Sequence, residues 1–192
     1  MFYQLVHFLH ILAVVFMSAP LYNLIVVNER AALGKAPLAV DRYFEDIIRG
    51  NALRCYVYQL TALVTGILLI PLIGMPWDSL LANPVLLAKL LLLLTLTGLL
   101  SVVHFRIQPA IDRLFGQVQG EEIPQEIVDR ILPLRLRRKR LAALCLFIVI
   151  TIVLLGLQVF SRFGLTLTGF LLAAAALFSW RVYKNPVRFG WL

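Results

Sequence analysis

Three histidines and one lysine could carry chemistry in this chain, because each lies inside or at the edge of a long apolar stretch. His7, His10 and His104 can bind a metal ion or move a proton, and Lys89 can hold an anionic group. An ionisable side chain at membrane depth is costly, so each of the four is a functional candidate. His7 and His10 share one helix face, but with no third protein ligand they are weak evidence for a metal site.

The depth of these groups follows from a helical rise of about 1.5 Å per residue. His10 lies about nine residues into the first apolar stretch, and Lys89 about five residues into the third from the same side, so we expect both within about one helical turn. His104 lies at the other end of the third stretch, roughly 25 Å away by the same rise. His10 and His104 therefore cannot ligate opposite faces of one iron atom.

Each candidate also has an ordinary structural interpretation. His7 can be an interfacial side chain, and His10 can be bonded to a neighbouring helix. Lys89 can extend along its apolar stem to the membrane surface. His104 is most simply an interfacial residue beside Arg106.

Five apolar stretches must position these residues. Crossing about 30 Å of hydrocarbon takes about 20 apolar residues in a helix, which satisfies its own backbone hydrogen bonds. The composition, 61% hydrophobic and 15% charged, agrees with such a protein. We predict an all-α polytopic membrane protein with a single domain over residues 1–192, a four-helix transmembrane bundle plus a fifth transmembrane helix packed outside it. The predicted spans are about 2–27, 53–74, 85–105, 141–160 and 165–182.

The cations lie almost wholly in alternate gaps between these stretches. They are Arg30, Lys35, Arg42, Arg49 and Arg54 in the first gap; Arg106, Arg113, Arg130, Arg135, Arg137, Arg138, Lys139 and Arg140 in the third; and Arg181, Lys184 and Arg188 in the tail. The positive-inside rule then predicts a bacterial inner membrane protein with its N-terminus outside and its C-terminus in the cytoplasm. The net charge of +8 comes mostly from these loops, so we expect a lipid bilayer and no nucleic acid as partner.

The segments on the basic side are not simple coil. Residues 37–48 and 123–134 mix apolar and charged side chains, which predicts two short amphipathic helices lying at the membrane surface. Pro109 is expected to close the third span. Cys55 and Cys145 lie where spans meet the basic loops, on the reducing side of the membrane. They are therefore expected to be packing thiols without a disulfide.

The first and third spans resemble a known family. The stretches LVHFLHILAVVFMSAPLYNLIVVNERA and NPVLLAKLLLLLTLTGLL are similar to the first and third helices of the HemJ-type protoporphyrinogen oxidases and the related CopD-like membrane proteins. The resemblance covers about residues 5–160, and His10 and Lys89 match the functional histidine and lysine. It implies a four-helix bundle in which the histidine is involved in binding haem b, and the fifth span is additional to it.

These observations lead to one preferred hypothesis and two alternatives. The preferred one is a haem-associated membrane protein with His10 as axial ligand, Lys89 beside a propionate or tuning the iron, and His7 nearby. The main alternative is a non-catalytic accessory subunit of a larger membrane complex, packed against other subunits or a second copy of itself. Copper transport ranks lowest, because the chain has only three methionines.

Overall fold

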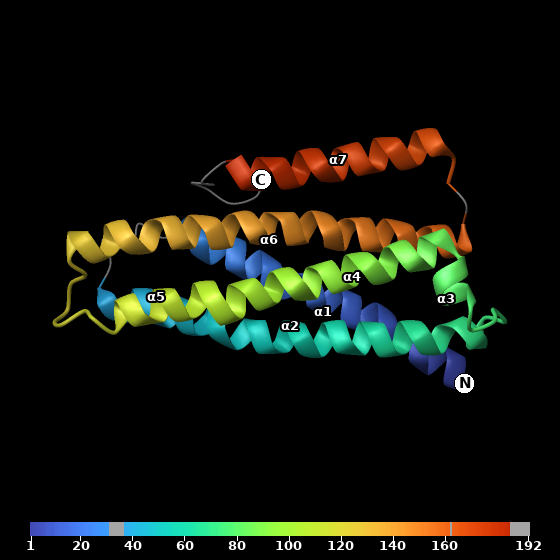
Figure 1. Ribbon diagram of the computed structural model, residues 1–192, viewed down its shortest axis with the longest axis horizontal. Coiled ribbons are helices and arrows are strands. Elements are labelled where there is room, and N and C mark those ends of the chain that lie inside the picture. Colours follow the sequence, from blue (N-terminus) through green and yellow to red (C-terminus); the bar gives the residue numbers. More distant parts are fainter. Residues whose placement is uncertain (31–36, 162, 185–192) are drawn as a thin grey trace.

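The computed structural model describes residues 1–30, 37–161 and 163–184, and these form helices with no strand (Figure 1). Five of the helices are long and apolar enough to cross a membrane, which confirms the predicted all-α polytopic architecture. The elements are α1 (Phe2–Arg30), α2 (Leu38–Leu72), α3 (Ser79–Ala82), α4 (Pro84–Val102), the π-helical segment η1 (Val103–Ile107), α5 (Gln108–Phe115), α6 (Gln125–Phe160) and α7 (Leu165–Lys184).

Four helices, α1, α2, α4 and α6, pack around one another, and α7 lies along the outer side of α6 (Figure 1). The middle of the bundle is filled by a cluster of buried side chains from all four helices. Its members are Met17, Leu21, Cys55, Leu96, Cys145, Ile148, Val149 and Ile152. The arrangement is the expected four-helix bundle with a fifth helix outside it.

The start of α4, which fixes the position of Lys89, is encoded locally. Asn83 has an extended backbone, and its side-chain oxygen accepts hydrogen bonds from the main-chain nitrogens of Val85 at 2.9 Å and Leu86 at 3.4 Å. Pro84 follows at the first helical position, where no hydrogen-bond donor is needed. This N-cap begins the third span five residues before Lys89.

Two of the helices are much longer than a membrane requires. With 35 residues in α2 and 36 in α6, each is roughly 50 Å long, whereas about 20 residues cross the hydrocarbon. The first turns of α2 and α6 therefore project beyond their apolar stretches. Together with η1 and α5 they enclose a second apolar core of Leu38, Val103, Ile107, Ile111, Leu114, Phe115, Val118, Ile123, Val128 and Ile131.

This extension corrects two predictions. Residues 37–48 and 123–134 are not surface helices, because residues 38–48 open α2 and residues 125–134 open α6. Their apolar faces pack against each other and against α5 instead of lipid.

Pro109 does not close the third span either. It lies in the first turn of α5, where a proline is tolerated, and the chain stays helical through η1 to Phe115.

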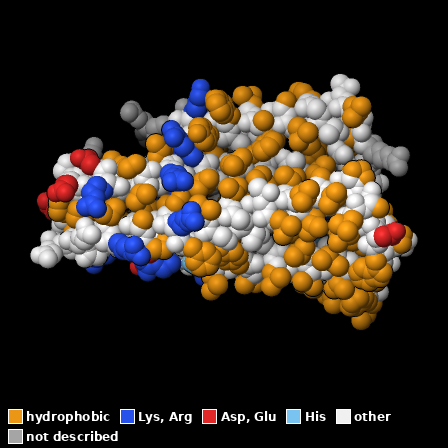
Figure 2. All heavy atoms as spheres, viewed as in Figure 1, with side chains coloured by type: hydrophobic (Ala, Val, Ile, Leu, Met, Phe, Trp, Pro, Cys, Tyr) orange, Lys and Arg blue, Asp and Glu red, His pale blue; other side chains and the backbone are white. Residues whose placement is uncertain are grey.

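The cations gather at the end of the bundle formed by α5, the starts of α2 and α6, and the end of α7. We call this the basic end, and the end with α3 and the start of α1 the opposite end. On the face drawn in Figure 2, Lys and Arg side chains cover the basic end while hydrophobic side chains dominate the rest. The sequence pattern and the fold therefore agree that the basic segments lie on one side of the spans.

Candidate functional site

The His10 ring is held by α2 near the opposite end of the bundle. Its Nδ1 lies 2.9 Å from Oγ1 of Thr65. The single hydroxyl hydrogen of Thr65 is directed to the main-chain oxygen of Thr61, at 2.5 Å. With its hydrogen on the Thr61 oxygen, the Thr65 hydroxyl would accept a hydrogen bond from Nδ1 of His10, and Nε2 would then be the unprotonated nitrogen.

Close packing reinforces this position of the ring. A Cβ atom at Gly66 would lie 3.1 Å from Cε1 of His10 and 3.6 Å from Nδ1. Any larger residue at this turn of α2 would push the ring away from Thr65. Thr65 and Gly66 therefore act together, since one orients His10 and the other leaves room for it.

Lys89 points into the bundle. Its side chain is half-buried, and a Cβ atom at Gly156 on α6 would lie 3.6 Å from Nζ. Phe160, one turn beyond Gly156 on α6, lies against His7 of α1, so His10 and Lys89 both belong to the part of the bundle near the opposite end.

His7 lies one turn from His10 and has aromatic neighbours. Its ring is 5.5 Å from that of Tyr3 and 5.9 Å from that of Phe160, measured between centroids. The part of the chain that the structure describes contains no group of three or more His, Cys, Asp or Glu side chains that could hold a metal ion. A metal bound at His10 would therefore need ligands from a cofactor, as haem iron has from its porphyrin.

His104 lies at the basic end, in η1, as the depth argument expects. It is not a simple interfacial side chain, because its Nδ1 is buried and has no hydrogen-bond partner among the described residues. It lines a cavity of about 50 Å³ together with Cys55, Gln59, Gln108 and Cys145. Both cysteines are free and buried, in agreement with the predicted packing thiols.

A buried ionic cluster joins α2, α5 and α6 at the basic end. Arg138 is fully buried and makes two hydrogen bonds to Glu45, at 2.5 and 2.9 Å, and one to Oε1 of Gln108 at 2.6 Å. Nε of Arg135 lies 3.4 Å from Glu45, and its Nη1 lies 4.0 Å from Asp41. Two arginines and two carboxylates thus balance one another in a site closed to water.

The cluster keeps Glu45 ionised. Burial by itself raises the pKa of this carboxyl, but the hydrogen bonds and charge of Arg138, with the charge of Arg135, outweigh burial and hold the pKa below its usual value. The ionised form therefore stabilises the fold at neutral pH. This contribution is lost as the pH falls through the lowered pKa.

The sequence analysis missed this cluster. It placed Arg135 and Arg138 only among the cations of the third gap. A signal was present, because the acids at 41 and 45 and the arginines at 135 and 138 are spaced to lie on single helix faces. That signal could be used only once the starts of α2 and α6 were known to lie side by side.

Comparison with protein-family models, with curated proteins and with solved structures found no match. The site must be judged on its own residues. A His10 ring whose Nδ1 is bonded to Thr65 can offer Nε2 to iron, as an axial haem ligand does, and Lys89 has the charge to hold a propionate. The cavity beside His104 is far too small for a porphyrin and lies towards the basic end.

Replacing Arg138 by methionine should lower the free energy of unfolding by about 3–5 kcal/mol, because it leaves the buried Glu45 carboxylate without its main partner. The matched control is Arg137→Met, at an exposed position one residue away, where a change within about 0.5 kcal/mol is expected. Chemical unfolding in detergent micelles would measure both. Equal effects of the two substitutions would contradict the role given to the cluster.

Proposed function

We propose that this protein binds haem b between α1 and α4, with His10 as axial ligand, and acts in redox or haem-related chemistry at the membrane. The observation that carries the proposal is the contact of His10 with Thr65. Nδ1 lies 2.9 Å from the hydroxyl oxygen of Thr65, whose own hydrogen is directed to Thr61; in this arrangement Nδ1 carries the hydrogen and Nε2 is available to iron. Histidine ligands of metals usually donate their other ring hydrogen to a protein oxygen, which fixes the tautomer and raises the basicity of the ligand.

Lys89 supplies the second contact in this proposal. The ammonium is directed into the bundle beside Gly156, and a glycine at that point leaves space around the charge. A carboxylate such as a haem propionate would neutralise a cation that is otherwise costly at membrane depth. A compact ammonium suits this role, and the larger planar guanidinium of arginine is a poor substitute for it.

The surrounding residues have distinct roles. Bound haem would supply one-electron chemistry at its iron. Thr65 orients the ligand, and Gly66 leaves room for the ring against α2. The ring of Tyr3 stacks on that of His7, and the ring of Phe160 lies tilted against the other side of His7, so these three form an aromatic group at the opposite end.

A second candidate function is supported by α7. This helix packs on α6, and its outward side exposes large apolar side chains, among them Leu165, Phe170, Leu177 and Trp180. Such a face suits lipid or another membrane subunit equally well. The accessory-subunit hypothesis needs no cofactor, so it predicts a folded but colourless protein.

We further propose that the protein lies in a bacterial inner membrane with its basic end in the cytoplasm, since cations flank the cytoplasmic ends of spans. With Cys55 and Cys145 replaced by serine, Ser79→Cys should react with a membrane-impermeant maleimide applied from the periplasm. Gln119→Cys and Tyr183→Cys should react only after the membrane is permeabilised. Labelling of Gln119→Cys in intact cells would reverse the proposed orientation.

Purified protein reconstituted with haem should show a Soret band and, on reduction, an α band. Both should disappear in His10→Ala and persist in His104→Ala, because His104 lies at the other end of the bundle. Absorbance spectra of the oxidised and reduced forms would show whether these two bands are present. A well-folded wild type that binds no haem would reject this function and favour the accessory subunit.

Two matched variants test the hydrogen bond between Thr65 and His10. Thr65→Val keeps the shape of the side chain but removes the acceptor for His10, and should weaken haem affinity about 10–100-fold. Thr61→Val is the control, because the hydroxyl of Thr61 bonds to its own helix at Val57. Titration with haem should separate the two variants, and equal affinities would show that Thr65 does not orient the ligand.

A further inference from the structure

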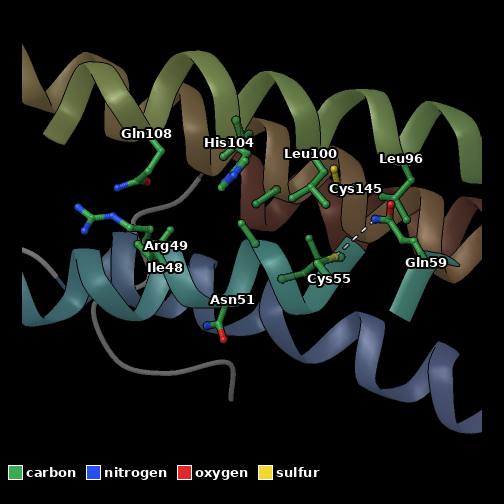
Figure 3. A pocket seen from close by; sticks show the side chains of 14 residues that line it. Ile48, Arg49, Asn51, Cys55, Gln59, Leu96, Leu100, His104, Gln108 and Cys145 are labelled. Atoms are coloured by element: carbon green, nitrogen blue, oxygen red, sulfur yellow. Dashed lines mark hydrogen bonds between the residues drawn. The ribbon is translucent and has the colours of Figure 1, made fainter. Parts of the chain in front are cut away.

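Inside the basic end, the glutamine side chains are bonded to other protein groups. Figure 3 shows Gln59 turned towards Cys55, and its amide nitrogen donates a hydrogen bond to the sulfur at 3.5 Å. The oxygen of Gln59 accepts a hydrogen bond from Thr97 at 2.8 Å, and Gln108 donates one to Glu45 at 3.2 Å. The outer surface of the same end is different, because exposed Lys and Arg side chains lie there (Figure 2).

On this surface α6 and α7 bring two cations and two aromatic rings together. Cζ of Arg140 lies 5.2 Å from the centre of the Tyr183 ring, and Nζ of Lys184 lies 4.8 Å from the centre of the Trp180 ring. The two rings stack on each other, with their centroids 5.7 Å apart and their planes 6° apart. We call these four exposed residues the cation–aromatic row. Each cation is held over a ring face, which favours a defined position for its charge.

The cations of the row are not paired with acids of the protein. Among the side chains that the structure describes, no ion pair to a carboxylate is found for Arg140, Lys184 or the neighbouring exposed Arg181. The last acid in the sequence, Asp129, lies eleven residues, or about 16 Å, before Arg140 along α6. This surface therefore favours an anion from outside the chain.

The row lies at the depth of lipid headgroups. Arg140 comes just before the apolar part of α6, and the other three residues lie in the last turns of α7. Closer to the middle of the spans, Leu144 is 45% exposed and Leu177 is 70% exposed. Leu144 follows Arg140 by four residues, and Leu177 precedes Arg181 by four, so each leucine shares a helix face with a cation. Positive charge and exposed apolar surface thus follow one another along both helices.

We propose that the cation–aromatic row binds the headgroup of an anionic phospholipid, whose acyl chains lie against Leu144 and Leu177. The guanidinium of Arg140 can donate paired hydrogen bonds to phosphate oxygens, and the ammonium of Lys184 adds a point charge. An exposed tryptophan such as Trp180 suits the boundary between headgroups and hydrocarbon. This inference depends neither on haem binding at His10 nor on which end of the bundle faces the cytoplasm.

Trp180 can report directly on the lipid beside it. The chain has three tryptophans, so Trp77→Phe with Trp191→Phe leaves Trp180 as the fluorescent one. The full chain is placed in bilayers of phosphatidylglycerol and phosphatidylcholine in which either lipid carries brominated acyl chains, which quench the indole on contact. The two quenching curves give the relative affinity of the lipids at Trp180. Phosphatidylglycerol should be preferred by at least about threefold, because cations near the surface attract anionic lipids.

Two double variants in this background separate the row from the general charge of the basic end. Arg140→Gln with Lys184→Gln should bring the preference to about one. Arg113→Gln with Arg130→Gln removes the same charge at exposed positions outside the row and should leave the preference unchanged. Equal losses in the two double variants would overturn the proposal.

Two further outcomes would also overturn it. A preference of about one with the row intact would exclude a lipid site and favour an acidic segment of a partner protein. Inorganic phosphate, exchanged for chloride at constant ionic strength, should leave the preference unchanged. Its loss in phosphate would assign the row to the free anion instead of a lipid.

Discussion

Hydrogen bonds from α2 to the other three bundle helices tie this membrane domain together. Thr65 bonds to His10 of α1, Gln59 to Thr97 of α4, and Glu45 to Arg138 of α6. At about 100° per residue, Glu45 and Gln59 lie on nearly the same side of α2, and Thr65 is turned about 120° from Gln59 towards α1. Inside hydrocarbon a polar group has no water as an alternative partner, so any other rotation of α2 would leave several groups unsatisfied. Apolar packing alone would specify the rotation of this helix far less strictly.

The three contacts also divide the molecule into regions with different chemistry. At the opposite end, Thr65 contacts His10, and this hydrogen bond joins α2 to α1. In the proposed site the same bond fixes the tautomer of His10, as a metal ligand requires. At the basic end, the contact of Glu45 locks the projecting parts of α2 and α6 to α5. Between them lie the Gln59–Thr97 pair and the buried apolar side chains around Leu96. The polar residues of one helix thus serve both stability and the placement of the candidate site.

The sequence predicted the five long apolar helices, because hydrocarbon imposes a length and a composition on any helix that crosses it. A constant rise per residue converts position into depth, and on that basis the similar depth of His10 and Lys89 stays a prediction. The sequence prediction failed for residues 37–48 and 123–134, where an amphipathic face can lie on lipid or on protein with the same pattern. It failed for Arg138 because its partners Glu45 and Gln108 are distant in sequence, and only the packing of α2, α5 and α6 brings them together.

The central claim is that Thr65 holds His10 as the Nδ1-protonated tautomer with Nε2 free. Nitrogen-15 NMR of histidine-labelled protein in bilayers distinguishes protonated from unprotonated ring nitrogens, and His10→Gln assigns the signal of His10. At neutral pH without haem, the account predicts a protonated Nδ1 and an unprotonated Nε2, with the tautomer preference lost in Thr65→Val. A His10 ring protonated at Nε2, alone or at both nitrogens, would contradict it.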